Sequence, residues 1–357
     1  MKSAPKTLST AFFMLIFVCG YSQESNFNMS GYLDFYYAYD FYDPPAKQRQ
    51  YITQAARHNE FNLNLGFVQA AYASDNIRGN LAIQVGTYPT ANYGGEPNAF
   101  AQLIQNASAG LKIGEKTWVD AGIMGGHFGY EGLISMDNEL YTQALATEYT
   151  PYYQTGVQLS SELSEKLSFR AVVINGWQNI YETNNGKSFG IGLDYMINDR
   201  WGISYGNYIG KDPVNGEDRL RFHNNFYLTY TGEKFSSAFV VDYMFEDLSN
   251  SQELALNQSS NLYFITFINQ FQINDSWKVA GRYEYVEDPA NALFSSPTGV
   301  FQSNIVTLAL RRSISEQVVF SMEFRQFFGK EDIWRSRENE TGTSNTILST
   351  GLTMRFF

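Results

Sequence analysis

The sequence predicts an all-β fold, a transmembrane antiparallel up-and-down β-barrel of about 16 strands, within a range of 12 to 18. Three observations predict it. Apolar and polar residues alternate along most of the chain, which is the two-residue period of a strand with two different faces. The segments between the alternating runs are short and long in turn. Aromatic residues make up 16% of the chain, and yet the chain is polar overall.

The first 22 residues are typical of a secretion signal. A basic start is followed by an uncharged apolar stretch over 10–18, and small residues stand one and three positions before a cut at Gln23. The apolar stretch is too short to span a membrane as a helix. We therefore expect residues 1–22 to be removed and residues 23–357 to form one barrel domain. A lipid anchor on Cys19 is the less favoured alternative, because the residue before it is not small.

The composition excludes several classes of function. Cys19 is the only cysteine, so the mature chain offers no disulfide, zinc-thiolate site or cysteine nucleophile. The net charge is −11 without a basic patch, which argues against nucleic acid as a partner. No later stretch of about 20 apolar residues exists. An aromatic but polar chain of this kind is expected of a barrel that meets membrane lipid on one face and water on the other. We expect no cofactor.

Alternation is clearest over 33–41, 219–230 and 318–325. Successive side chains of a strand point to opposite faces, so each run has one apolar and one polar face. On this basis we predict strands near 29–42, 58–73, 77–88, 101–113, 117–125, 151–162, 166–177, 188–197, 200–210, 219–231, 234–246, 260–273, 276–287, 300–312, 316–328 and 345–357.

The gaps between these strands alternate between short and long without exception. The short gaps contain Asn, Asp, Gly and Ser, which suit tight turns. This pattern is typical of a barrel with short periplasmic turns and long extracellular loops. The long gaps are expected near 43–57, 89–100, 126–150, 178–187, 211–218, 247–259, 288–299 and 329–344.

The chain also carries two outer-membrane features. Aromatic residues follow several short turns, as in the aromatic girdle at the membrane interface; they are Trp118, Trp201, Phe235 and Trp277. The last residue is Phe357, on an alternating strand whose apolar face lies one position away from it. A terminal Phe of this kind is usual in such barrels. We therefore expect the protein in the bacterial outer membrane.

A family resemblance is carried by five segments and is densest over about 120–225. These segments are Asp120–Ile123 with Gly129–Glu131, Asp137–Asn138, Thr150–Val157, Asn175–Gln178, and Ile209–Asp212 continuing to His223. The chain resembles the β-barrel porins described as OmpL-like, in the form found in Bacteroidetes. It departs from them at Thr142-Gln143, where the family has Ser or Thr followed by Arg. The resemblance implies an outer-membrane channel and does not specify a solute.

The longest expected loop, 126–150, is the candidate constriction. In general porins one long loop folds into the lumen, and an acidic loop facing a basic wall would select solutes by size and charge. In the alternative interpretation these residues are ordinary lumen charges that pair with one another in water. The pore-lining or constriction candidates are Arg170, Arg221, His223, Arg282, Glu284, Glu323 and Arg325 on strands, and Glu131, Asp137 and Glu139 in the loop.

The function we expect is a passive channel for small hydrophilic solutes or ions, with no enzymatic activity, because about 16 strands leave an aqueous channel. Two alternatives stay open: a barrel that anchors a surface or secretion complex, and a membrane-embedded hydrolase that uses His223. No Gly-x-Ser-x-Gly motif accompanies that histidine. A homotrimer also stays open, as does a calcium ion held by oxygens of residues 137–139.

Overall fold

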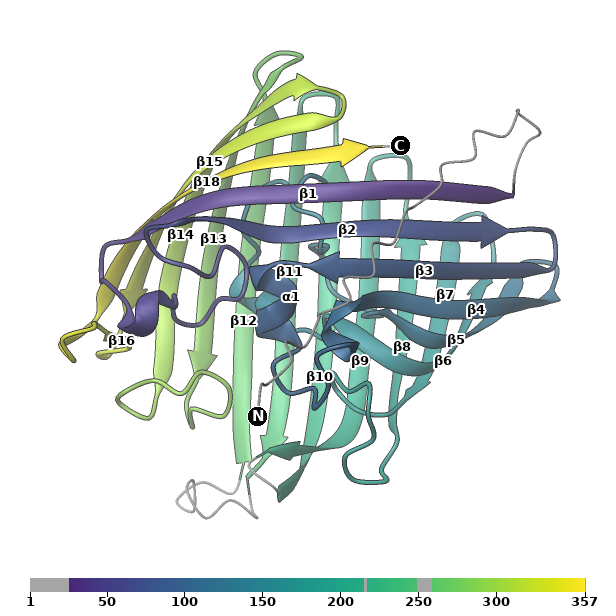
Figure 1. The fold of residues 1–357 in the computed structure, drawn as a ribbon, viewed down its shortest axis with the longest axis horizontal. Coiled ribbons are helices and arrows are strands. Elements are labelled where there is room, and N and C mark those ends of the chain that lie inside the picture. The colour runs from purple at the N-terminus through teal and green to yellow at the C-terminus, as the bar shows by residue number, and fades with distance from the viewer. Residues whose placement is uncertain (1–25, 215–216, 249–258, 357) are drawn as a thin grey trace, which may run out of the picture.

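Backbone pairing between neighbouring strands closes the chain into a barrel (Figure 1). The computed structural model describes residues 26–214, 217–248 and 259–356. In these residues sixteen strands form one antiparallel ring in chain order, and the last strand pairs with the first. The ring consists of β1 (Phe27–Asp40), β2 (Phe61–Ala73), β3 (Ile77–Val85), β4 (Ile104–Gly114), β5 (Thr117–Gly125), β6 (Tyr153–Glu162), β7 (Leu167–Ile174), β8 (Ser188–Met196), β9 (Trp201–Val214), β10 (Glu217–Thr231), β11 (Phe235–Asp247), β12 (Ser259–Gln272), β13 (Trp277–Asp288), β14 (Phe301–Ser315), β15 (Val318–Gly329) and β18 (Ser344–Phe356).

The barrel closes where β1 meets β18, which lie side by side in Figure 1. Their register runs from Gly31 opposite Phe356 to Asp40 opposite Ile347. This pairing leaves no open sheet edge, as a sheet in lipid requires. The predicted fold class and all sixteen predicted strands are confirmed. The predicted signal segment 1–22 and the terminal Phe357 lie outside the described residues.

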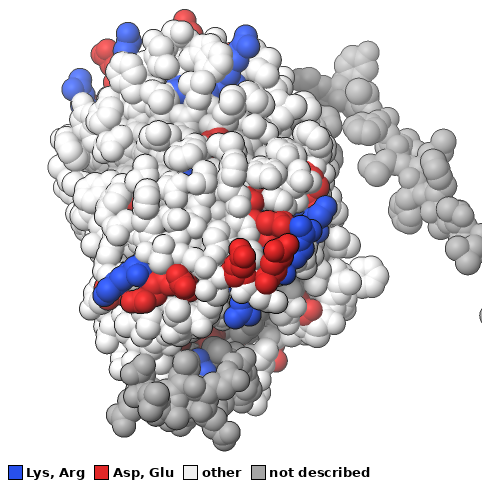
Figure 2. All heavy atoms as spheres, turned by 90° about the vertical axis from the view of Figure 1, so that its left-hand side faces the viewer, with Lys and Arg blue, Asp and Glu red and all other residues white. Residues whose placement is uncertain are grey.

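The two faces of each strand differ as the alternation predicts. On β14 the side chains of Thr307 and Arg311 are buried inside the barrel, whereas Leu308 and Leu310 are exposed on its outer surface. An outer band of this kind meets the lipid chains. Figure 2 shows one side of the molecule, where charged side chains gather at two levels and other residues fill the broad zone between them.

One predicted loop is wrong. The segment 211–218 is mostly strand, because β9 and β10 stay paired as far as Val214 and Glu217. The alternation of short and long connections therefore has one exception. The reason is physical: this end of the hairpin is rich in charged residues, so it lacks the apolar alternation that marks a strand in lipid.

Part of the inner surface is apolar, which the alternation did not predict. At the long-loop end, side chains from β11 to β15 and β18 form an apolar cluster with residues of the loops. The buried members include Phe264, Phe301 and Phe327 from the strands, with Ile52 and Trp334 from the loops. The loops at this end are therefore packed into the barrel on one side.

The loops contain short elements that the sequence pattern did not predict. These are η1 (Pro45–Lys47), α1 (Thr87–Asn92), η2 (Ala101–Leu103), α2 (Leu145–Glu148) and a small separate sheet of β16 (Trp334–Arg335) and β17 (Thr341–Gly342). Within the described ranges, no helix combines the length and the apolar character needed to cross a membrane.

The outer face generates a prediction about depth. Leu308→Arg places a charge at the middle of β14 on the lipid side and should lower the free energy of unfolding by about 2–4 kcal/mol. Ile314→Arg, near the short turn of the same strand, should cost only about 0–1 kcal/mol. Equilibrium unfolding in lipid vesicles measures both. Equal losses would contradict the placement of this band in the membrane.

Candidate functional site

The segment 126–152 between β5 and β6, called the inward segment below, lies inside the barrel. Its central residues Leu140 to Leu145 are almost fully buried, although they belong to a connection between strands. Leu140 packs against Ala238, Ile268 and Ala309 of the inner wall. The inward segment therefore crosses the lumen and reaches the opposite wall.

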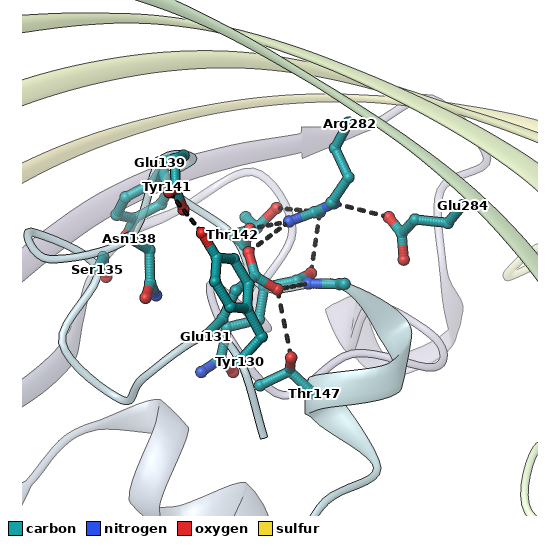
Figure 3. Close-up of polar contacts among 12 residues, drawn as sticks. Tyr130, Glu131, Ser135, Asn138, Glu139, Tyr141, Thr142, Thr147, Arg282 and Glu284 are labelled. Carbon is teal, nitrogen blue, oxygen red and sulfur yellow. Dashed lines mark hydrogen bonds and ion pairs between the residues drawn. The ribbon is translucent and has the colours of Figure 1, made fainter. Parts of the chain in front are cut away.

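Two arginines of the wall hold the backbone of the inward segment, and Figure 3 shows the first of them, Arg282, beside Thr142 and Glu284. Arg282 on β13 donates to the carbonyl oxygens of Thr142 at 2.5 Å and of Gln143 at 3.0 Å. Arg325 on β15 donates to the Gln143 carbonyl as well, at 3.1 Å. Both guanidinium groups also contact Glu284, each at 2.9 Å. The two cations thus neutralise one buried acid and bind the segment.

Carboxylates of the same wall accept the amide hydrogens of the inward segment. The Leu145 N–H donates to Glu284 at 2.7 Å. The N–H groups of Tyr141 and Thr142 donate to Glu323, at 3.1 and 3.0 Å. Hydrogen bonds to a charged acceptor are stronger than neutral ones. An irregular segment can stay inside the barrel because its backbone groups are paired in this way.

Glu131 completes this cluster from the segment itself. Its carboxylate forms an ion pair with Arg282 at 3.0 Å and accepts the Ala144 N–H at 2.7 Å. Burial raises the pKa of this carboxyl to about 7, against the lowering effect of Arg282. We call Glu131, Arg282, Glu284, Glu323 and Arg325 the anchor cluster.

A second set of contacts holds residues 135–138. The Asp34 carboxylate on β1 accepts hydrogen bonds from Ser135 at 2.8 Å and from the Tyr141 hydroxyl at 2.9 Å. Arg311 on β14 donates to the carbonyl oxygens of Ser135, Met136 and Asn138. These bonds fix the segment to β1 and β14, which are separated in the ring by β18 and β15.

Glycines on the inner wall make room for three rings of the inward segment. A methyl group on Gly190 would lie 2.2 Å from the His127 ring, and one on Gly206 would lie 2.3 Å from Phe128. A methyl group on Gly351 would lie 2.3 Å from the Tyr141 ring. All three are far inside ordinary contact distance, so the rings fit only because these positions lack a side chain.

The structure brings half of the sequence-predicted candidates together in the anchor cluster. The others lie apart, and each has a partner of its own. Arg170 pairs with Asp194 at 2.5 Å, Asp137 with Arg355 at 2.6 Å, and Glu139 accepts the Tyr130 hydroxyl at 2.6 Å. Arg221 pairs with Glu246 and lies over the Trp177 ring, and His223 contacts Asp242 at 2.7 Å.

Several contributing residues were missed by the sequence analysis. They are Asp34, Arg311, and the glycines at 190, 206 and 351. For Asp34 and Arg311 the available signal was parity, which places both on the inner faces of their strands. The glycines also fall on inner positions of alternating strands, and a Gly there indicates a close approach by another segment.

The hydrolase and calcium alternatives find no matching geometry. The Nε2 atom of His223 contacts Asp242, and its Nδ1 atom has no hydrogen-bond partner among the described residues, so no serine hydroxyl is paired with it there. The side chains of residues 137–139 bond to three different partners. In the part of the chain that the structure describes, no group of three or more His, Cys, Asp or Glu side chains could hold a metal ion.

A cavity of about 280 Å³ adjoins the inward segment. It is lined by the segment ends 125–133 and 147–152, by α1, and by Arg170 and Tyr227 of the wall. A second hollow of about 550 Å³ lies near the short-turn end and is lined by β3 and by strands from β5 to β8. Arg170 lines both spaces.

Residues 26–356 match the family described as "Putative beta-barrel porin-2, OmpL-like". A search of curated proteins gives no match. Solved barrels share the fold. Outer-membrane expressed OmpT of Vibrio cholerae has a TM-score of 0.63 at 12% identity, with 92% of this chain and 97% of that chain covered.

Two more solved structures are similar to this chain. OmpF of Salmonella typhi in complex with daunomycin has a TM-score of 0.60 at 14% identity and covers 92% and 97% of the two chains. The anion-selective porin from Comamonas acidovorans has a TM-score of 0.59 at 11% identity and covers 92% and 99%. At such identities the likeness establishes the fold alone.

The anchor cluster generates the next prediction. Arg282→Ala leaves Glu131 and Glu284 buried with fewer partners and should weaken docking of the inward segment by about 3–5 kcal/mol. Hydrogen exchange at the amides of Ala144 and Leu145 should become faster. Arg355→Ala is the control, because it breaks a solvent-exposed pair worth about 0–1 kcal/mol. Unchanged exchange in the Arg282 variant would show that the cluster does not hold the segment.

The raised pKa of Glu131 predicts a pH dependence. An exposed glutamate loses its proton near pH 4.5, whereas Glu131 in the folded protein keeps it up to about pH 7. Between these values the unfolded chain binds fewer protons, so the Glu131 contribution to the free energy of unfolding falls as pH rises.

Glu131→Gln should remove this contribution, which amounts to at most about 3 kcal/mol. Comparing the unfolding of the two proteins in lipid vesicles from pH 4 to pH 8 isolates it from other titrating groups. Parallel curves for both proteins across this range would refute the raised pKa.

Proposed function

Because the chain belongs to the family described as "Putative beta-barrel porin-2, OmpL-like", we propose that small hydrophilic solutes cross it by passive diffusion through a lumen that the inward segment narrows. The protein is an outer-membrane porin and not an enzyme. The finer parts of the proposal concern the constriction, the roles of the candidate residues, the processing of the chain and its assembly.

The observation that carries the constriction is that the inward segment leaves the wall at β5 and β6 and is bonded to the other side of the barrel. The anchor cluster binds it to β13 and β15, and Asp34 binds it to β1. A segment bonded in this way reduces the open cross-section permanently, since it has no free end inside the barrel. Size selection by a fixed constriction follows from this arrangement.

We assign the candidate residues two roles. Glu131, Arg282, Glu284, Glu323 and Arg325 position the inward segment, in support of which all five are buried and each bonds to the segment or to a residue that does. Arg170 lines the open space. The pairs that contain Arg221 and His223 stiffen the wall beside Trp177, and Asp137 and Glu139 tie down the middle of the segment through Arg355 and Tyr130.

The proposal includes a removed signal at residues 1–22 and long loops on the extracellular side. It also includes a homotrimer. In its support, apolar hollows lie on the outer face of β1, β14, β15 and β18, and OmpT of Vibrio cholerae is described in a trimer form. The mass of the native protein in mild detergent tests the trimer, and N-terminal sequencing of the exported protein tests the signal.

The direct test is the conductance of the refolded mature protein in a planar bilayer. Stable current steps support the channel. A folded barrel that passes neither current nor solute would contradict it.

The constriction generates its own prediction. Replacing residues 133–140 by a short glycine linker removes the middle of the inward segment and should raise single-channel conductance severalfold. The control replaces the exposed turn at 336–340 by the same kind of glycine linker and should leave conductance unchanged. A shortened inward segment with unchanged conductance would mean that it does not limit flow.

A further inference from the structure

The interior of the barrel is filled unequally. On the side of β11 to β15 and β18, the interior is filled by the anchor cluster and the apolar cluster, whose side chains are buried. On the side of β3 to β10, two spaces remain open. They are the cavity of about 280 Å³ and the hollow of about 550 Å³ near the short-turn end, called the lower hollow below. Arg170 lines both of these spaces, so they adjoin at this residue of β7.

Aromatic rings dominate the cavity, and their hydroxyls are fixed. The rings belong to Tyr88, Phe128, Tyr130, Tyr152 and Tyr227. The Tyr88 hydroxyl donates to Gln143 at 2.7 Å and the Tyr152 hydroxyl to Gln84 at 2.6 Å. The rings of Tyr88 and Tyr152 meet edge to face with centroids 5.0 Å apart. Held in this way, the rings offer rigid apolar surfaces beside polar groups.

The polar groups of the cavity are mostly uncharged. Asn92, Gln143, Thr147 and Thr150 contribute amides and hydroxyls. The lining contains one acid and one guanidinium, Glu131 and Arg170, and each is already paired with an opposite charge. The cavity therefore carries little net field for an ion of either sign.

Charges in the lower hollow are paired in the same manner. Arg78 pairs with Asp120, Lys116 with Glu162 at 3.4 Å, and Arg170 with Asp194 at 2.5 Å. The pairs join β3 to β5, the turn after β4 to the end of β6, and β7 to β8. Only Glu115 adds a further acid among the described lining residues. Paired charges of this kind present local dipoles to a solute. They do not form the ring of like-charged side chains that selects ions of one sign.

We propose that solutes cross the barrel on the side of β3 to β10, through the cavity and the lower hollow, and that this path favours small uncharged polyhydroxy compounds such as monosaccharides over ions. The inference rests on the proposed function, because it specifies the route and solute class of the same channel. Ring faces stack on the apolar faces of a sugar, and amides and hydroxyls bond its hydroxyl groups.

Single cysteines test the route, because the mature chain from Gln23 onward has none. Thr147→Cys lies in the cavity and Ser160→Cys in the lower hollow. Ser349→Cys is the matched control, since Ser349 is a buried inner residue on the filled side. A bulky neutral maleimide should react at the first two sites, as mass spectrometry would show, and lower conductance severalfold. The control should neither react nor lose conductance.

The route is overturned if either path cysteine stays unmodified, if modification leaves conductance unchanged, or if the Ser349 variant is the one that closes. The solute class is tested separately by liposome swelling. Arabinose should enter faster than gluconate or N-methylglucamine, and the reversal potential in a salt gradient should lie near zero. A strong preference for one ion sign would overturn the solute class.

Charge variants of the Arg170–Asp194 pair test the route further, because Arg170 lines both spaces. Arg170→Gln leaves Asp194 unbalanced and should shift the reversal potential toward cation preference, whereas Asp194→Asn should shift it toward anion preference. Shifts of the same sign, or none, would place the pair outside the path. If the unaltered barrel passes neither ions nor sugar, the proposed function itself fails, which is a different result from a channel with another route.

Discussion

The closure of the sheet between β1 and β18 is the constraint on which the rest of the structure depends. In the hydrocarbon layer no water is present to bond free backbone groups, so a sheet must have no edge. Once the ring is closed, the direction of every strand side chain is fixed by parity. Leu308 must meet lipid because Thr307 faces the interior. The interior then receives all the polar side chains, and these need partners of their own.

Many of those partners belong to the inward segment. Wall and segment each supply both donors and acceptors of hydrogen bonds to the other. Arginines of the wall bind carbonyl oxygens of the segment, and carboxylates of the wall bind its amides. Buried charges are costly unless they are paired and hydrogen-bonded. Here the charges at Arg282 and Glu284 meet both requirements at once. The same contacts allow a segment without regular secondary structure to occupy the centre of a barrel.

Most of the fold could be predicted from the sequence because the period of two is a local property. Parity also identified the inner charges, including the four strand residues of the anchor cluster, whereas Glu131 was proposed as an acid of the long loop. Parity could not predict the height of each residue along the barrel axis, because register depends on the neighbouring strand. The pairing of Asp34 with Ser135 and Tyr141 could therefore not be predicted. The apolar inner patch at Phe264 and Phe301 was missed since local alternation says nothing about a loop that packs over it. The hairpin at 211–218 was missed because it lacks alternation.

The position of the inward segment in the chain has a consequence for biogenesis. The segment connects β5 and β6, whereas five of its charged partners lie on β13, β14 and β15, namely Arg282, Glu284, Arg311, Glu323 and Arg325. A sheet that ends before β13 therefore lacks these five partners, and contacts between distant parts of a chain form late. The inward segment consequently reaches its final, fully bonded position only as the last strands join. An assembly that stalls before β13 would lack both the closing pair of β1 with β18 and the bonds that fix the constriction.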